Sequence, residues 1–209
     1  KLAEFELIYT FGVEPLQQYL ALFPGGRLQS LTIAWDTERG EWFHLYPHER
    51  ILPDDPLHWT GRYQNWNAMC AECHSTNLRK NYDPDTEMYR TVWDKIDVGC
   101  QACHGPGEAH VEWARSVNAH RKTDVAATGL VVDLASANAL NEIESCAGCH
   151  SRRQRINHID RHARPLLDDF RPSTLQDGLY HADGQIQDEV YVWGSFAQSK
   201  MYEAGVRCS

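Results

Sequence analysis

The sequence predicts a mainly α-helical and irregular chain with a small antiparallel β meander at its N-terminal end. Residues 1–55 contain no cysteine and hold most of the alternating, β-rich runs, whereas residues 56–209 hold all seven cysteines between short helical patterns and loops. At 209 residues the chain is long enough for one domain or two small ones. We therefore expect a β-rich N-terminal part, 1–55, followed by a second part, 56–209, that carries the cysteine chemistry.

The β-rich part is predicted from runs of β-branched, aromatic and alternating residues. These runs cover 6–11, 19–23, 28–36 and 41–46. Pro-Gly-Gly at 24–26 and Thr-Glu-Arg-Gly at 37–40 supply turns between them. A proline-rich connector, 47–56, then leads into the second part.

The second part is predicted to contain short helices separated by loops. Helices are expected at 63–73, 106–118 and 137–149, then a strand at 187–192 and a helix at 195–203. Pro106 suits the first turn of a helix, where its missing N–H costs nothing.

The pentapeptide Cys-x-x-Cys-His occurs three times in this part, and it is the attachment signature of c-type haem. The two thiols add to the vinyl groups of the porphyrin, and the histidine binds the iron as its proximal ligand. The predicted attachment cysteines and proximal ligands are Cys70, Cys73 and His74; Cys100, Cys103 and His104; Cys146, Cys149 and His150. Three haems would supply much of the apolar core, so little regular secondary structure is needed.

Two other readings of the motif remain open at this point. A redox dithiol would normally occur once, near a β-α-β pattern, and needs no histidine. Zinc is the better rival because cysteine and histidine are its usual ligands, although zinc sites seldom place histidine directly after the second cysteine three times over.

Eight of the eleven histidines are left after the three proximal ligands, which is a large surplus for a domain of this size. Histidine is the natural sixth ligand of low-spin haem iron, so we expect mostly bis-histidine haems. The leading candidates are His110, His181 and His58. His158 and His162 lie four residues apart, and of these two we expect His162 to be a ligand. His44, His48 and His120 are expected to be structural or surface residues.

Two further features lie next to the motifs. Cys208 is predicted to be the first cysteine of another haem motif, with the sequence being a piece of a longer or processed chain; the alternative is a single cysteine at a frayed end. The basic cluster 152–155 is either a solvated helix face or a partner for haem propionates, since arginine matches carboxylates well.

The bulk composition limits partners and location. The net charge of −9 argues against nucleic acid and favours other redox proteins, haem subunits or a larger multihaem assembly or filament. The sequence contains no run of 18 apolar residues, so no membrane span is predicted. Covalent haem attachment indicates a periplasmic or extracellular bacterial protein.

The stretch Cys100-x-x-Cys-His-Gly-Pro-Gly-x-x-His110 is similar to the tetrahaem cytochrome c family that accepts electrons from hydroxylamine oxidation. The stretches 63–67, 70–77 and 195–202 resemble bacterial multihaem cytochromes with tetratricopeptide repeats. The resemblance implies further haem motifs on either side, His110 as ligand to an upstream haem, and His181 as ligand to the third.

The sequence therefore predicts electron transfer through at least three covalently bound c-type haems, and no catalytic residue is assigned. The alternative is a multihaem oxidoreductase that reduces nitrogen or sulfur oxyanions at one five-coordinate haem. Against it, no Cys-x-x-Cys-Lys variant is present, and the histidines suffice to saturate every iron.

Overall fold

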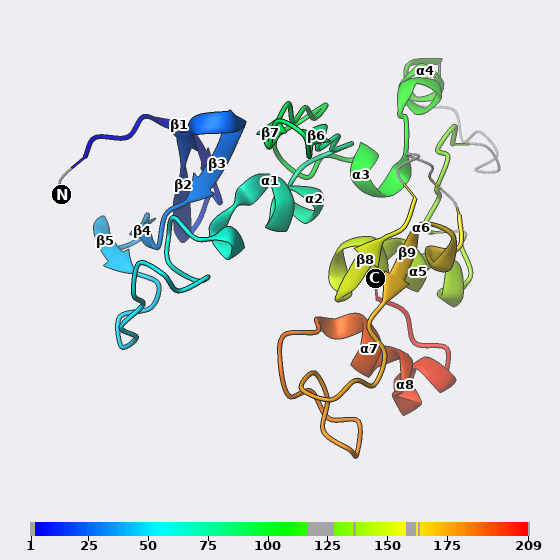
Figure 1. Ribbon diagram of the computed structural model, residues 1–209. Coiled ribbons are helices and arrows are strands. Elements are labelled where there is room, and N and C mark those ends of the chain that lie inside the picture. The colour runs from blue at the N-terminus through cyan, green and yellow to red at the C-terminus, as the bar shows by residue number, and fades with distance from the viewer. Residues whose placement is uncertain (1–2, 117–127, 136, 158–161, 163, 209) are drawn as a thin grey trace. The chain divides into compact units, whose positions relative to one another are not determined.

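The computed structural model describes residues 3–116, 128–135, 137–157, 162 and 164–208, and the chain divides into two compact units (Figure 1). The first unit is Lys1–Val98 and the second is Gly99–Ser209. The predicted boundary near residue 55 falls inside the first unit, so the β-rich part and the first Cys-x-x-Cys-His motif share one compact body.

The first unit is built on a five-stranded antiparallel sheet in the order β1-β2-β4-β5, with β3 also paired to β2. Its strands are β1 (Leu7–Phe11), β2 (Leu16–Phe23), β3 (Arg27–Ser30), β4 (Ile33–Asp36) and β5 (Glu41–His44). The eight-residue β2 pairs with β3 along one half and with β4 along the other. The predicted run 28–36 is thus two strands, β3 and β4, that follow each other along one edge of β2, and the meander is confirmed.

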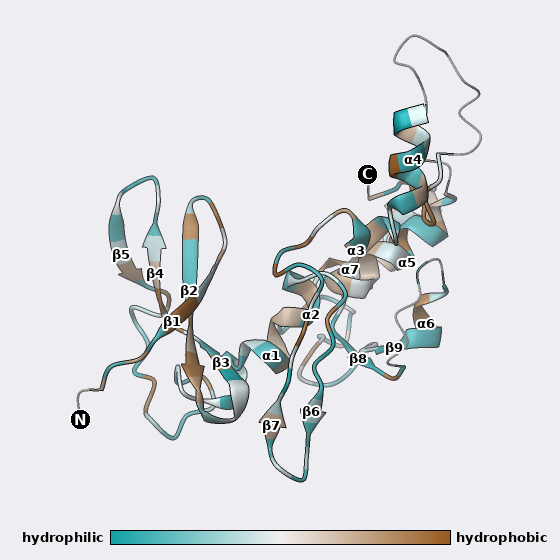
Figure 2. Ribbon diagram, turned by 90° about the horizontal axis from the view of Figure 1, so that it is seen from above, coloured by the Kyte–Doolittle hydropathy of each residue, from teal (hydrophilic) through white to brown (hydrophobic). Residues whose placement is uncertain are grey.

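The core of the first unit lies where this sheet meets the first motif. Leu20 on β2 and Leu28 on β3 pack with Trp66 and Ala71, and all four are buried. Figure 2 shows a hydrophilic stretch and a hydrophobic stretch along β2, and the buried Leu20 and Ala21 belong to its hydrophobic second half. Partly buried side chains complete the cluster: Ile8, Phe11, Cys70, Leu78, Trp93 and Ile96.

The helix predicted at 63–73 is broken into shorter pieces. A 3-10 turn, Arg62–Gln64, is followed by α1 (Trp66–Met69) and α2 (Ala71–His74). The break at Asn65 arises because its extended backbone forms a bridge with Gln29, while its side chain caps α1 by accepting from the Ala68 N–H. A short hairpin, β6 (Tyr82–Asp83) with β7 (Met88–Tyr89), was not predicted from the sequence.

In its described residues, the second unit contains helices and one two-stranded sheet. Its helices are α3 (Gln101–His104), α4 (Glu108–Ser116), α5 (Ala139–His150), α6 (Leu166–Asp169), α7 (Val192–Ala197) and α8 (Lys200–Glu203). The sheet pairs β8 (Arg153–Arg155) with β9 (Phe170–Pro172). α5 is capped by Asn138, whose side chain accepts from the Asn141 N–H, and it continues to the end of the third motif.

Three predictions for the second unit need correction. No strand forms at 187–192: Val190 is buried and its carbonyl accepts a bond from the Arg152 N–H, but no strand ladder forms there. The helix expected at 195–203 is two helices, because Ser199 has extended backbone and caps α8. Of the two alternatives for the basic cluster 152–155, the helix face does not hold, because Arg153–Arg155 form the strand β8.

Among the helices that the structure describes, none combines the length and the apolar character that a bilayer crossing would need.

Candidate functional site

Each Cys-x-x-Cys-His motif occupies one helical turn. In the first motif the N–H groups of Cys73 and His74 both bond to the Cys70 carbonyl, at 3.1 Å each. In the second, the His104 N–H bonds to the Cys100 carbonyl at 3.0 Å, and the third motif forms the last turns of α5. Residues three and four apart share a helix face, so both thiols and the imidazole of each motif point to one side of the chain.

All seven cysteines lie in the described part of the chain. Burial, with a smaller contribution from Cys73, raises the pKa of the Cys70 thiol to about 11. Zinc displaces the proton of a thiol when it binds, so this raised pKa does not separate the zinc reading from the haem reading.

The structure brings cysteines from separate motifs of the second unit together. Burial raises the pKa of Cys146 to about 11, and Cys208, Glu142 and Cys103 add to the increase through their charges. Cys208 also forms a hydrogen bond with Cys146. The second motif, the third motif and the C-terminal cysteine thus share one neighbourhood, which their separation in sequence did not reveal.

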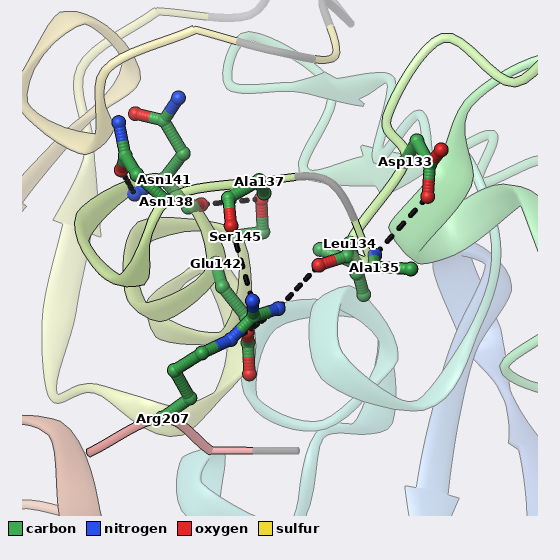
Figure 3. Close-up of polar contacts among 9 residues, drawn as sticks. All are labelled: Asp133, Leu134, Ala135, Ala137, Asn138, Asn141, Glu142, Ser145 and Arg207. Carbon is green, nitrogen blue, oxygen red and sulfur yellow. Dashed lines mark hydrogen bonds and ion pairs between the residues drawn. The ribbon is translucent and has the colours of Figure 1, made fainter. Parts of the chain in front are cut away.

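A buried ion pair holds Cys208 at this place. Figure 3 shows the Arg207 guanidinium directed at Glu142 on α5, whose side chain is fully buried. The same guanidinium donates to the carbonyls of Ala137, at 3.1 Å, and Leu134. These bonds fix the segment that carries Cys208 against the first turn of the helix that ends in the third motif.

In two imidazoles of the second unit, one ring nitrogen forms a hydrogen bond with a backbone carbonyl. His104 Nδ1 lies 2.8 Å from the Val132 carbonyl, and His110 Nδ1 lies 2.7 Å from the Thr128 carbonyl. A carbonyl only accepts, so both Nδ1 atoms must carry the hydrogen. In the neutral ring this leaves the Nε2 lone pair available to a metal, which is the usual arrangement of a metal-binding histidine.

His58 and His44 differ from this pattern. The backbone N–H of Thr60 donates to His58 Nδ1 at 3.3 Å, and that of Tyr46 donates to His44 Nδ1 at 3.0 Å. A nitrogen that accepts leaves the hydrogen on Nε2 in the neutral ring, and Nε2 is then no ligand. The Thr60 hydroxyl also lies 2.8 Å from His58 Nδ1. A hydroxyl can accept as well as donate, so His58 can also hold its hydrogen on Nδ1, whereas His110 must hold it there.

The other candidate histidines lie at different places. His162 is next to the second motif: a Cβ on Gly105, directly after His104, would come within 3.1 Å of its ring. His181 is exposed in a turn in which its N–H bonds to the Gln185 carbonyl. Of the first-motif residues, His74 is exposed and its ring meets Phe11 of β1 edge-on. His120 and His158 lie outside the described residues.

The basic cluster is engaged with other side chains and with backbone. The guanidinium groups of Arg153 and Arg155 both lie over the Phe170 ring, at 4.1 Å and 4.9 Å from its centre. Arg152 donates to the Glu189 carbonyl at 2.8 Å and contacts Asp188. A guanidinium that lies over a ring still has N–H groups at the ring edge that can bind a carboxylate. Pairing of this cluster with propionates therefore remains a prediction.

The residues present fit covalent haem. Each motif places two thiols and an imidazole on one helix face, and the imidazole of the second motif has its Nε2 available. Trp66, four residues before Cys70, is fully buried, and its indole N–H has no hydrogen-bond partner among the described residues. When bound, haem iron accepts and donates single electrons.

Comparison with known proteins supports this reading in part. Residues 57–105 match the family model described as cytochrome c554 and c-prime, a segment that contains the first two motifs but less than half of the chain. A search of curated proteins finds no significant match. Among solved structures, the chain is similar to a crystal structure of outer cell wall cytochrome OcwA at 20% identity and a TM-score of 0.40. That similarity covers 85% of this chain and 30% of the other, and it carries no argument about activity.

Proposed function

We propose that this chain transfers electrons through at least three covalently bound c-type haems, most of them with two histidine ligands. The observation that carries the proposal is the second motif and its surroundings. There, two thiols and His104 share a helical turn, and both His104 and His110 have Nδ1 bonded to a carbonyl. The match of residues 57–105 to a c-type cytochrome family supports the same chemistry.

The residues have distinct roles in this proposal. The paired cysteines hold the porphyrins, with Cys208 beginning one more site, and His74, His104 and His150 are the proximal ligands. His110 is the best supported distal ligand because of its Nδ1 bond. The remaining candidates are His162, which lies next to the second motif, His181, and His58, whose Nδ1 contacts the Thr60 hydroxyl.

A saturated iron changes little on reduction, since both axial positions are occupied in either oxidation state. Such haems pass single electrons rather than bind substrate, and the protein sets each potential through ligand, burial and nearby charge. The closeness of Cys103, Cys146 and Cys208 supports a short path between neighbouring haems of the second unit.

The proposed partners are other redox proteins or haem subunits, in a periplasmic or extracellular setting. The net charge of −9, to which propionates would add, favours a partner with a positive surface. Association should then weaken as ionic strength rises, because salt screens charges that lie farther apart than about 8 Å.

The proposal is tested by optical and electron paramagnetic resonance spectra of the purified holoprotein. We expect a c-type spectrum with three or more haems per chain and low-spin ferric signals. A chain without covalent haem would overturn the proposal. A high-spin signal that changes on addition of nitrite or hydroxylamine would show an open iron, and the oxidoreductase alternative would then replace simple electron transfer.

A further inference from the structure

The segment 128–132 contacts both histidines that have their Nδ1 atoms bonded to carbonyls. Its Thr128 carbonyl accepts from His110 at 2.7 Å, and its Val132 carbonyl accepts from His104 at 2.8 Å. The Val132 N–H also donates to the His104 carbonyl at 3.1 Å, so this peptide contacts both the ring and the backbone of the same histidine. Five residues therefore orient two imidazoles that belong to different helices, α3 and α4.

The segment reaches α4 because of one glycine. A Cβ on Gly129 would lie 2.7 Å from the carbonyl carbon and oxygen of Ala109 and 2.8 Å from the His110 nitrogen. These atoms are helix backbone and cannot swing aside as a flexible side chain would. Gly129 also has φ +73°, a conformation that residues with a side chain rarely adopt.

The geometry points to Gly129 as the positioning residue for the imidazoles of His104 and His110, an inference that rests on the proposed haem function. By letting segment 128–132 lie directly against α4, Gly129 keeps both carbonyls within hydrogen-bond distance of both Nδ1 atoms. A hydrogen bond from Nδ1–H to a carbonyl makes an imidazole a stronger ligand and favours ferric iron. One segment thus tunes two axial ligands at once.

The test compares Gly129→Ala with two glycine controls in the holoprotein. Gly178→Ala carries the same kind of strain, at φ +80°, but its Cβ would meet nothing within 4 Å. Gly40→Ala, in the first unit, has φ +68° and also meets nothing within 4 Å. The readouts are haem content, the midpoint potential of each haem, and the spin state of the ferric protein.

We expect Gly129→Ala to raise the midpoint potential of the haem attached at Cys100 and Cys103, because His104 loses its carbonyl partner. Loss of a histidine's outer partner typically weakens metal affinity by at least tenfold, so release of His110 should appear as a new high-spin signal. Both controls should retain the wild-type potentials and spectrum. Identical behaviour of Gly129→Ala and Gly178→Ala would overturn the inference.

A second measurement covers the case in which Gly129→Ala does not fold. In the wild-type holoprotein, the Nδ1–H protons of His104 and His110 should exchange slowly with solvent in paramagnetic NMR spectra. Rapid exchange of both protons would reject the inference even without the variant. A wild-type chain without covalent haem would reject the proposed function itself, so the two failures are distinguishable.

Discussion

The two units of this chain differ in what they bury. The first buries an apolar cluster between a sheet and two helical turns, around Leu20 and Trp66. The second buries charged groups: Glu142 is fully buried in its ion pair with Arg207, and Asp169 is 8% exposed beside Arg164. Its described buried apolar side chains come from separate segments: Val132, Ile143, Ala147, Leu166, Tyr180 and Val190.

This difference indicates how each unit depends on haem. An apolar cluster stabilises a fold by itself, because the area removed from water contributes in proportion to its size. In the described residues of the second unit the buried apolar side chains are spread over separate segments, so we expect bound porphyrins to link them. We therefore expect the second unit to depend on its cofactors more strongly than the first.

The largest expected effect comes from removing a haem in each unit separately. The double variant Cys146→Ala/Cys149→Ala should lose one haem per chain and leave the second unit open to limited proteolysis. The matched double variant Cys70→Ala/Cys73→Ala should also lose one haem, yet retain the sheet of the first unit in its circular dichroism spectrum. Equal loss of structure in both variants would contradict the comparison.

Truncation of the first unit's apolar cluster should be the next largest effect. Leu20 is fully buried, so Leu20→Ala should lower the free energy of unfolding of the first unit by about 3 kcal/mol. Leu22, on the same strand, is 42% exposed, so Leu22→Ala serves as the control with an effect below about 1 kcal/mol. Denaturant unfolding followed by fluorescence measures both, and similar losses would show that the cluster is not the unit's core.

Breaking the buried ion pair should destabilise the second unit by a smaller amount. Arg207→Met leaves the Glu142 carboxylate buried without this partner, at a cost of about 2 kcal/mol for lost charged hydrogen bonds. Arg171 is an exposed arginine of the same unit, and Arg171→Met should cost less than about 0.5 kcal/mol. Thermal unfolding of the holoproteins gives both values, and equal melting temperatures would refute the expected role of the pair.

The smallest expected effect is local to the β6–β7 hairpin. The Thr86 hydroxyl donates to Asp83 at 2.8 Å and, with backbone bonds from Asp85 and Thr86, lowers the pKa of that carboxyl. A carboxyl with a lowered pKa stabilises the fold at pH values above its ordinary pKa. This stability is lost as the pH falls through the folded-state pKa. Thr86→Val should therefore raise the pKa of Asp83 in an NMR titration, while Thr86→Ser should preserve it.

If Thr86→Val leaves the pKa of Asp83 unchanged, the Thr86 hydroxyl is not the main cause of the lowered pKa. Because Asp83 is at the surface, neither variant should change the melting temperature of the unit measurably.

Local sequence features predicted the sheet of the first unit well. β1, β2 and β5 begin and end close to the predicted runs, because alternation and Pro-Gly turns act over a few residues. Pairings between distant segments were not predictable in the same way. β8 and β9 each have three residues and join across fourteen residues of chain, so neither carries a periodic pattern of its own.

The spacing of the cysteines and histidines was enough to predict the proposed attachment chemistry, since two thiols and an imidazole at fixed spacing reach one face of a helical turn whatever surrounds them. Only the tertiary structure distinguished the spare histidines, because the partner of Nδ1 decides whether Nε2 has a lone pair for iron. That partner is Thr128 for His110 and Thr60 for His58. The approach of Cys103, Cys146 and Cys208 likewise depends on how distant segments pack, which no local pattern encodes.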